Sequence, residues 1–221
     1  MLDKIKGKLI VSVQALEGEP LHDPFIMSKM ALAAKEGGAH GIRSNSKQDI
    51  IAIRKEVDLP IIGLVKKTYN DSEIFITPTK KEVLDLIESG CDMIALDATM
   101  RKRPNGESLQ DLVNFIHQNN RLAMADISTF EEAINAEKIG FDCISTTLSG
   151  YTEYSKKTDC PDYNLIKKCV KKLKIPVIAE GKIKEVSQLK RILKYKPYAV
   201  VIGSAITRPK LITERFAAAF D

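Results

Sequence analysis

Polar and charged side chains stand directly after several short apolar runs of this 221-residue sequence. Gln14, Arg43, Lys66, Asp126 and Glu180 each occupy such a position. A lysine amine and carboxylates are groups that general acid–base chemistry uses. Charges set against apolar segments are costly unless they are paired or used in a reaction. The pattern therefore predicts a catalytic site assembled from the ends of separate apolar runs.

Lys66 and Glu180 are the candidate catalytic residues. Lys66 ends the run 61–65. Poor hydration and a nearby cation such as Arg43 lower the pKa of a lysine and make a neutral amine available near pH 7. The alternative is a solvent-facing lysine in an ion pair. Glu180 is expected to act as a general acid or base, or to keep Lys66 charged. Asp126 is expected to bind substrate or orient Lys66, or else to form a structural ion pair.

The runs themselves alternate with helical patterns of roughly a dozen residues. This alternation predicts parallel strands joined by crossover helices. Its even spacing and the length of the chain favour a single (β/α)8 TIM barrel over residues 1–221, with no break into two domains. The expected strands are 9–13, 41–43, 61–65, 93–96, 122–125, 143–146, 177–179 and 199–202.

The helix boundaries support this alternation. Thr79 with Glu82, and Thr129 with Glu132, have the spacing of capping boxes, in which each residue satisfies an amide of the other. A glycine, such as Gly90, follows each of these helical patterns and ends it, because glycine enters the left-handed conformation at little cost. We therefore expect a loop and a buried strand after each glycine.

In a barrel the polar strand ends converge on the carboxyl-terminal mouth, where the sites of this fold lie. The loops after the last two strands often bind phosphate through backbone amides and a short helix N-terminus. Here Gly181 and Lys182 follow the seventh run, and Gly203, Ser204 and Arg208 follow the eighth. Glycine allows close approach of the backbone, and arginine binds phosphate with a planar fork. We expect a phosphate site in these two loops.

The composition excludes several partners. The formal net charge of +5 is moderate, with 34 basic against 29 acidic residues. No basic run is interleaved with stacking aromatic residues, so nucleic acid is not an expected partner. No apolar run approaches the ~20 residues of a membrane span, and the sequence begins without a secretory pattern. We expect a cytoplasmic protein with no membrane partner, and reduced thiols at its four cysteines.

Metal ions and nucleotide cofactors have no sequence support. The three histidines are scattered and show no zinc spacing. A divalent cation on Asp97, Asp126 and Glu180 is disfavoured because Lys66 and Arg43 bring cations to the same mouth. The sequence contains neither a dinucleotide-binding glycine motif after a strand nor a Walker A loop. We expect no metal and no cofactor.

The motifs together resemble the N-acetylmannosamine-6-phosphate 2-epimerase family of (β/α)8 barrels over almost the whole chain. The resemblance implies interconversion of N-acetylmannosamine 6-phosphate and N-acetylglucosamine 6-phosphate, without an organic cofactor, in the breakdown of sialic acid or amino sugars. It rests on Ser12-Val13-Gln14-Ala15, Gly41-Ile42-Arg43, Ile62-Gly63-Leu64-Val65-Lys66, Asp97-Ala98-Thr99-x-Arg101-x-Arg103-Pro104, Met124-Ala125-Asp126-Ile127-Ser128, Thr146-Thr147-Leu148-Ser149-Gly150-Tyr151-Thr152, Ala179-Glu180-Gly181-Lys182 and Val201-Ile202-Gly203-Ser204-Ala205-Ile206-Thr207-Arg208-Pro209.

The two sugars differ only at C2, next to the C1 aldehyde of the open chain. The expected mechanism is removal of the C2 proton to give an enolate, followed by protonation on the opposite face. Lys66 and Glu180 would transfer protons, either as two bases or with Lys66 alone and a relay through a substrate hydroxyl. Gln14 and Arg43 would hold the sugar oxygens and the developing charge, which fixed cations stabilise well. Asp126 would orient the substrate.

Two further expectations have open alternatives. A lysine Schiff-base aldolase on the same fold would use Lys66 to form an imine with a sugar phosphate. The C-terminal stretch 216–220, Phe-Ala-Ala-Ala-Phe, is compatible with packing on a neighbouring copy, which gives a homodimer. It is equally compatible with packing on its own barrel.

Overall fold

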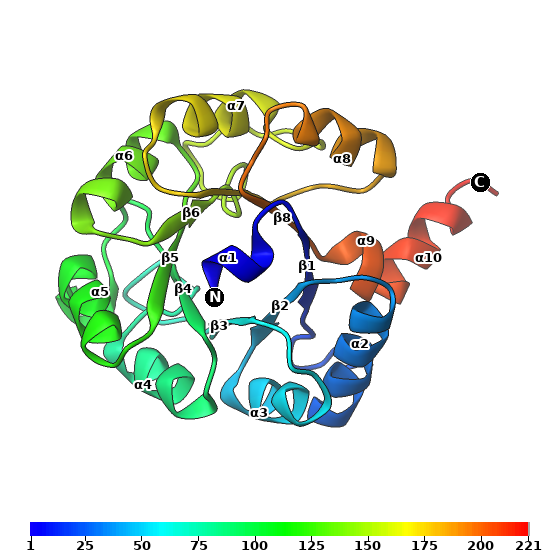
Figure 1. Ribbon diagram of the computed structural model, residues 1–221, viewed down its shortest axis with the longest axis horizontal. Helices are drawn as coiled ribbons and strands as arrows, with labels where there is room; N and C mark the ends of the chain where they lie inside the picture. Colours follow the sequence, from blue (N-terminus) through cyan, green and yellow to red (C-terminus); the bar gives the residue numbers. More distant parts are fainter. Residues whose placement is uncertain (221) are drawn as a thin grey trace.

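The computed structural model describes residues 1–220, which form a closed barrel of parallel strands (Figure 1). Each strand pairs in parallel with the next in sequence, and β8 pairs with β1 to close the ring. The predicted (β/α)8 TIM barrel is confirmed. The strands are β1 (Leu9–Val13), β2 (Gly41–Asn45), β3 (Ile61–Leu64), β4 (Met93–Asp97), β5 (Leu122–Asp126), β6 (Cys143–Ser145), β7 (Val177–Ala179) and β8 (Ala199–Ile202).

Five strand ends differ from the predicted ends by one or two residues. β2, β4 and β5 extend further because the parallel ladder continues: Asn45 lies opposite Leu64, and Asp97 lies opposite Asp126. β3 ends at Leu64, and β6 ends at Ser145. The carboxylates of Asp97 and Asp126 are therefore carried by strands and not by the loops that follow them.

Helices α2–α8 surround the barrel, α1 lies across one end of it, and α9 and α10 follow β8 (Figure 1). The 3-10 turn η1 lies between β4 and α5. These elements are α1 (Leu2–Ile5), α2 (Pro24–Glu36), α3 (Lys47–Glu56), α4 (Lys80–Ser89), η1 (Pro104–Gly106), α5 (Leu109–Gln118), α6 (Phe130–Ile139), α7 (Tyr163–Lys172), α8 (Val186–Leu193), α9 (Ser204–Thr207) and α10 (Pro209–Ala217).

The capping boxes at α4 and α6 are present as predicted. The Thr79 amide donates to a carboxylate oxygen of Glu82 at 2.9 Å, and the Thr129 amide donates to Glu132 at 3.0 Å. Helix α4 ends at Gly90, whose φ of 77° is in the left-handed region that favours glycine. These local signals fix where each helix begins and ends, and so where the next strand enters the barrel.

Alternation along the strands decides which side chains fill the barrel. Successive residues of a strand point to opposite faces. In β1, Ile10 belongs to the cluster inside the barrel, whereas Val11 belongs to the cluster between the barrel and the helices. Ile5 of α1 joins the inner cluster, so α1 closes the amino-terminal end of the barrel (Figure 1). The inner cluster also contains Ile62, Leu64, Ile76, Met93, Ala95, Met124, Cys143, Leu148, Ile178, Ala199 and Val201.

Helix α10 projects away from the barrel (Figure 1), and none of its residues is buried. Phe216 in this helix is 72% exposed, and Phe220, just beyond it, is 92% exposed. Neither phenylalanine packs on the barrel of its own chain within the described residues, so that alternative is wrong. Over the same residues, no helix has the length and apolar character needed to cross a membrane.

Candidate active site

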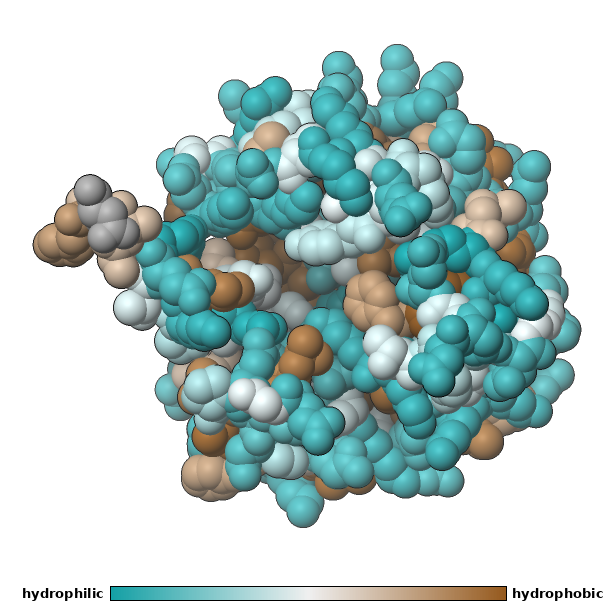
Figure 2. Space-filling view, turned by 180° about the vertical axis from the view of Figure 1, so that it is seen from behind, coloured by the Kyte–Doolittle hydropathy of each residue, from teal (hydrophilic) through white to brown (hydrophobic). Residues whose placement is uncertain are grey.

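A cavity of about 730 Å³ opens at the carboxyl ends of the strands, opposite the end that α1 closes. Figure 2 shows this end of the molecule as a hollow with apolar residues inside it and α10 standing out beside it. Residues from β1, β2 and β8 and from the loops after β3, β6 and β7 line the cavity, and α10 contributes one side. Four of the five polar strand ends predicted to meet at a mouth therefore line it, namely Gln14, Arg43, Lys66 and Glu180, and Asp126 does not.

Arg43 is the centre of a buried network of charges. Its guanidinium donates to both oxygens of Asp126, at 3.0 and 2.6 Å, and to Glu180 Oε2 at 3.0 Å. Arg43 is 1% exposed and Asp126 is fully buried. The two carboxylates raise the pKa of Arg43 above its ordinary value against the opposing effect of burial. The guanidinium is therefore permanently charged and fixed in a planar, two-pronged contact.

Lys66 lies in the same cavity, and its amine is free. Its backbone amide donates to Asn45 Oδ1 at 2.8 Å, and an antiparallel bridge joins Lys66 to Ile76. Within residues 1–220, Lys66 Nζ makes no hydrogen bond and no ion pair. Burial, followed by repulsion from Arg43 and Arg208, lowers the pKa of Lys66 to about 8. The predicted depression of this pKa is therefore present, for the two predicted reasons.

The neighbouring Lys67 provides a contrast. Its side chain is 46% exposed and its amine lies 3.9 Å from Glu82. Lys67 does not line the cavity. A solvent-facing lysine with an ionic neighbour, which was the alternative considered for Lys66, therefore describes Lys67 instead.

Glu180 is held by one of its two carboxylate oxygens. Oε2 accepts hydrogen bonds from Arg43, Ser145 and Thr147 at 3.0 to 3.1 Å. Its backbone is fixed by Thr146, whose hydroxyl donates to the Glu180 carbonyl at 2.8 Å and accepts from the Glu180 amide at 3.1 Å. Burial raises the pKa of Glu180 above its ordinary value, while Arg43 opposes that rise. Burial thus disfavours the charged form of this carboxyl, which makes Glu180 a candidate for proton transfer.

Ser12 of β1 and Gln14, just after this strand, complete the polar wall. Gln14 Nε2 donates to Ser12 Oγ at 2.7 Å, whereas Gln14 Oε1 is buried without a hydrogen-bond partner among the described residues. Both residues line the cavity. An unpartnered acceptor in such a place costs stability unless a ligand supplies a donor, which fits the predicted contact between Gln14 and a sugar hydroxyl.

The two glycine-containing loops meet at one side of the cavity, and all five residues predicted there line it: Gly181, Lys182, Gly203, Ser204 and Arg208. Gly181 has a φ of 108°, a conformation open to glycine. A Cβ on Gly203 would come within 3.2 Å of the Ser12 Cβ. The backbone at these two glycines is therefore exposed to the cavity without a side chain covering it.

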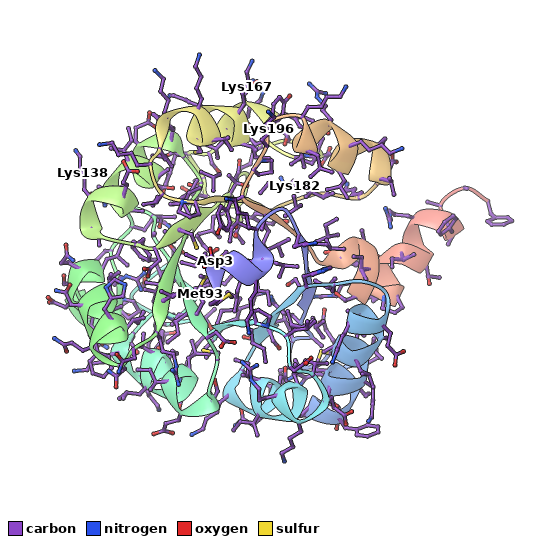
Figure 3. All side chains as sticks on the ribbon, viewed as in Figure 1. Asp3, Met93, Lys138, Lys167, Lys182 and Lys196 are labelled. Carbon is purple, nitrogen blue, oxygen red and sulfur yellow. The ribbon has the colours of Figure 1, made fainter. Side chains whose placement is uncertain are left out.

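The cations of these loops are partly engaged. Arg208 forms an ion pair with Glu19 of the loop after β1. Lys182 Nζ donates to the Thr158 carbonyl at 2.5 Å and lies over the Tyr151 ring. Figure 3 shows Lys182 inside the ring of helices, whereas Lys138 and Lys167 point outwards. Both side chains therefore line the cavity while each is held by a neighbour.

Asp126 and Asp97 do not reach the cavity. Neither lines it, and both carboxylates are fully buried. Asp126 is committed to Arg43, so the expected contact between Asp126 and substrate does not fit its position, and the ion-pair alternative does. Asp97 accepts from the Thr99 hydroxyl at 2.7 Å and from Arg101 at 2.8 Å, and so orders the loop after β4.

Ser145 and Glu19 were not expected at the site, whereas Thr147 and Tyr151 belong to the motif 146–152 but had no predicted role. Thr147 and Tyr151 line the cavity, and Ser145 and Thr147 hydrogen-bond Glu180. A usable signal existed for two of them. Cys143 lies inside the barrel, so Ser145, two residues further along β6, is expected to face inwards as well, and Thr147 follows at the same spacing just beyond the strand.

Among residues 1–220, no three His, Cys, Asp or Glu side chains form a group that would hold a metal ion. The carboxylates of Asp126 and Glu180 are instead bridged by the guanidinium of Arg43. The positive charge between these two carboxylates is therefore the side chain of an arginine.

Known proteins similar to this chain identify its family. The family described as "Putative N-acetylmannosamine-6-phosphate epimerase" matches residues 27–221. The chain belongs to this epimerase family. A "Putative N-acetylmannosamine-6-phosphate 2-epimerase" of Clostridioides difficile is 58% identical over 221 residues, which are 100% of this chain and 99% of the relative. One of Clostridium perfringens is 59% identical over 216 residues, 98% of each chain. The predicted resemblance is confirmed.

Solved structures agree with the epimerase family. The structure of the N-acetylmannosamine-6-phosphate 2-epimerase from Clostridium perfringens matches with a TM-score of 0.98 and 58% identity, over 99% of this chain and 96% of that one. A thiamine phosphate pyrophosphorylase from Pyrococcus furiosus matches with a TM-score of 0.64 at 19% identity, over 96% of this chain and 92% of that one. The second match shows that the barrel is shared, and nothing more.

Proposed function

We propose that this protein interconverts N-acetylmannosamine 6-phosphate and N-acetylglucosamine 6-phosphate by inverting C2. The family match over nearly the whole chain carries the proposal. The geometry supports it, because a half-buried, unpaired lysine amine and a carboxyl share one cavity with two glycine-containing loops. The reaction is a 1,1-proton transfer at carbon, and no organic cofactor or metal is needed for it.

Lys66 is the principal proton-transfer residue in this proposal. Its neutral amine takes the C2 proton of the open-chain sugar, the C–H electron pair moves into an enolate, and negative charge develops on the C1 oxygen. Returning a proton to the opposite face gives the other epimer. A pKa of about 8 keeps a useful fraction of this amine neutral at physiological pH.

Glu180 is the partner of Lys66 at the reacting centre. Its Oε2 is held by three donors, so its other oxygen is left for the substrate. Arg43 places a fixed positive charge beneath the centre, where the enolate develops. Asp126 acts on Arg43 and not on the sugar. Gln14 Oε1 accepts from a sugar hydroxyl, which supplies its missing donor.

The phosphate binds where the loops after β7 and β8 meet. Backbone amides near Gly181 and at the start of α9 face the anion, Ser204 donates a hydroxyl proton, and Arg208 exchanges Glu19 for a phosphate oxygen. Binding the far end of the sugar fixes C2 against Lys66 and lowers the entropy cost of reaching the transition state. The pathway that such a reaction serves is the breakdown of sialic acid or amino sugars.

Proton NMR of the purified protein with N-acetylmannosamine 6-phosphate in D2O tests the function. The expected result is appearance of N-acetylglucosamine 6-phosphate together with deuterium at C2. Absence of both would refute the proposal. Repeating the exchange with Glu180→Gln separates the two proton routes, because exchange on one face only indicates two bases, and unchanged exchange indicates Lys66 with a substrate relay.

A lysine Schiff-base aldolase is the second candidate, because a half-buried amine with a lowered pKa also favours imine formation. The test is reduction with borohydride in the presence of a sugar phosphate, followed by mass spectrometry of the peptide that contains Lys66. A covalent adduct on Lys66 supports the aldolase, and its absence alongside turnover supports the epimerase.

A homodimer is also proposed. Helix α10 leaves Phe216 and Phe220 exposed, and a second copy of the chain would cover them. Phe216→Glu is expected to lower the mass measured by light scattering, whereas the exposed Phe25→Glu on α2 is expected to leave it unchanged. A monomeric wild-type protein would refute this assembly.

A cytoplasmic location is proposed from the thiols. Burial raises the pKa of Cys91 to about 11 and of Cys169 to about 12, which leaves both unreactive. All four cysteines are unpaired. Cell fractionation with a tagged chain checks the location, and recovery from a secreted or membrane fraction would contradict it.

A further inference from the structure

Thr147 occupies an unusual position between two carboxylates. Its hydroxyl oxygen lies 2.6 Å from Asp126 Oδ1 and 3.0 Å from Glu180 Oε2. It also lies 2.8 Å from the Ser145 hydroxyl and 3.5 Å from Arg43 Nη1. Thr147 directly follows Thr146, which fixes the Glu180 backbone, and it lines the cavity itself. One small side chain thus joins the buried ion pair to the candidate acid.

The hydroxyl brings only one proton to these neighbours. A hydroxyl has one donor proton and two acceptor lone pairs. Its shortest contact is with Asp126, while Arg43 and Ser145 supply donors on the Glu180 side. The single proton therefore serves one carboxylate at a time, and when it is donated to Glu180 it holds Oε2 and lowers the pKa of Glu180. Without that hydroxyl, the pKa of Glu180 rises, because repulsion from the negative charge of Asp126 is opposed by one hydrogen bond fewer.

The carboxylate of Glu180 is used asymmetrically. Every hydrogen bond of its side chain within residues 1–220 is made by Oε2. Oε1 makes none, and it is not among the buried atoms that lack a partner. The oxygen held by Thr147 and the oxygen left for substrate are therefore different atoms. Holding one edge of a carboxylate fixes the direction of the other.

We propose that Thr147 is a positioning residue of the epimerisation, which holds Glu180 by its Oε2 edge and turns Oε1 to the substrate. The inference rests on the proposed function. The charged and titratable groups that face Glu180 are Arg43 from β2, Asp126 from β5, Lys66 after β3 and Tyr151 from the loop after β6. Hydrogen bonds from hydroxyls lower the pKa of Glu180, and burial raises it.

Three variants test the proposal. Thr147→Val keeps the shape of the side chain and replaces the hydroxyl with a methyl group. Thr147→Ser keeps the hydroxyl and removes the methyl group. Thr152→Val is the matched control, because Thr152 is buried in the same loop and its hydroxyl donates to Ser128 at 3.0 Å, away from both carboxylates.

The kinetic arm measures kcat, KM and the pH profile for N-acetylmannosamine 6-phosphate. Thr147→Val is expected to lower kcat by about 10-fold or more, as for the loss of a hydrogen bond to a charged group, with little change in KM. The alkaline limb of its kcat profile, where a proton-donating Glu180 loses its proton, should move to higher pH, because the Thr147 hydroxyl lowers the pKa of Glu180. Thr147→Ser should behave like wild type, and Thr152→Val should keep the wild-type profile.

The second arm needs no turnover. Infrared titration of the ligand-free protein follows the carboxylic acid band that is lost in Glu180→Gln. Thr147→Val should move the midpoint of this band to higher pH, and Thr147→Ser should not. An unmoved midpoint, an unmoved kcat profile, or a Thr147→Ser variant as impaired as Thr147→Val would each overturn the proposal. Wild-type protein that does not epimerise the sugar would instead refute the proposed function, and this inference with it.

Discussion

Replacing Lys66 with arginine keeps a positive charge at the cavity but removes the group that loses a proton near neutral pH. The pKa of Lys66 falls from 10.5 to about 8 through burial and through repulsion from Arg43 and Arg208. At pH 7.5, about 24% of the amine is then neutral, against about 0.1% at the ordinary pKa. An arginine stays protonated at this pH. Loss of the base is expected to lower kcat by about 10²–10⁴-fold.

The assay is the rate of product formation by proton NMR, with Lys67→Arg as the control. Lys67 is the next residue, is exposed and does not line the cavity, so the same exchange there should leave the rate unchanged. For wild type, activity should rise as the pH rises through about 8, because a lysine gains its neutral form as the pH passes its pKa. A Lys66→Arg enzyme within about tenfold of wild type would refute the assignment of Lys66 as the base.

Three other changes have defined outcomes. Asp126→Asn leaves Arg43 buried with Glu180 as its only carboxylate partner in the described structure, and should lower the free energy of unfolding by about 3–5 kcal/mol in urea titrations. Arg208→Ala should raise KM by about 10–100-fold with a smaller change in kcat, because a charge-assisted contact to phosphate is lost. Gly63→Ala should cost about 1–3 kcal/mol in thermal unfolding, since its Cβ would come within 2.9 Å of Cys91 and Ile50, while kcat at low temperature is retained.

The fold was accessible from the sequence because its local signals agree. The capping boxes at Thr79 and Thr129 fix two helix starts, and Gly90 fixes a helix end. Apolar runs of four or five residues between such signals leave strands as the consistent choice. The strand ends were less accessible: Asp97 and Asp126 look like loop residues, yet they pair with each other across β4 and β5. The ladder depends on the neighbouring strand, which local sequence does not specify.

The site was accessible only in part. The meeting of Lys66, Glu180 and Arg43 follows from the barrel, since all strand ends converge. The commitment of Asp126 to Arg43 depends on the distance between β2 and β5, which no local pattern contains. Ser145 and Thr147 are small hydroxyl residues with many possible roles, so only their spacing from Cys143 marks them. The direction of α10 was not predictable, because the sequence of residues 216–220 is equally compatible with packing on a neighbouring copy and with packing on its own barrel.

The barrel is open at one end only, because Ile5 of helix α1 and the inner apolar residues fill its interior below the polar side chains of the cavity. A phosphosugar seated at the open end then stands between the reacting carbon and bulk water. A hydrogen lifted from that carbon stays on the side chain that took it while the enolate lasts. With Lys66 as the sole proton carrier, some product molecules should therefore carry the hydrogen that their substrate brought in, even in D2O, whereas protonation by Glu180 on the opposite face gives a product whose C2 hydrogen comes from the solvent.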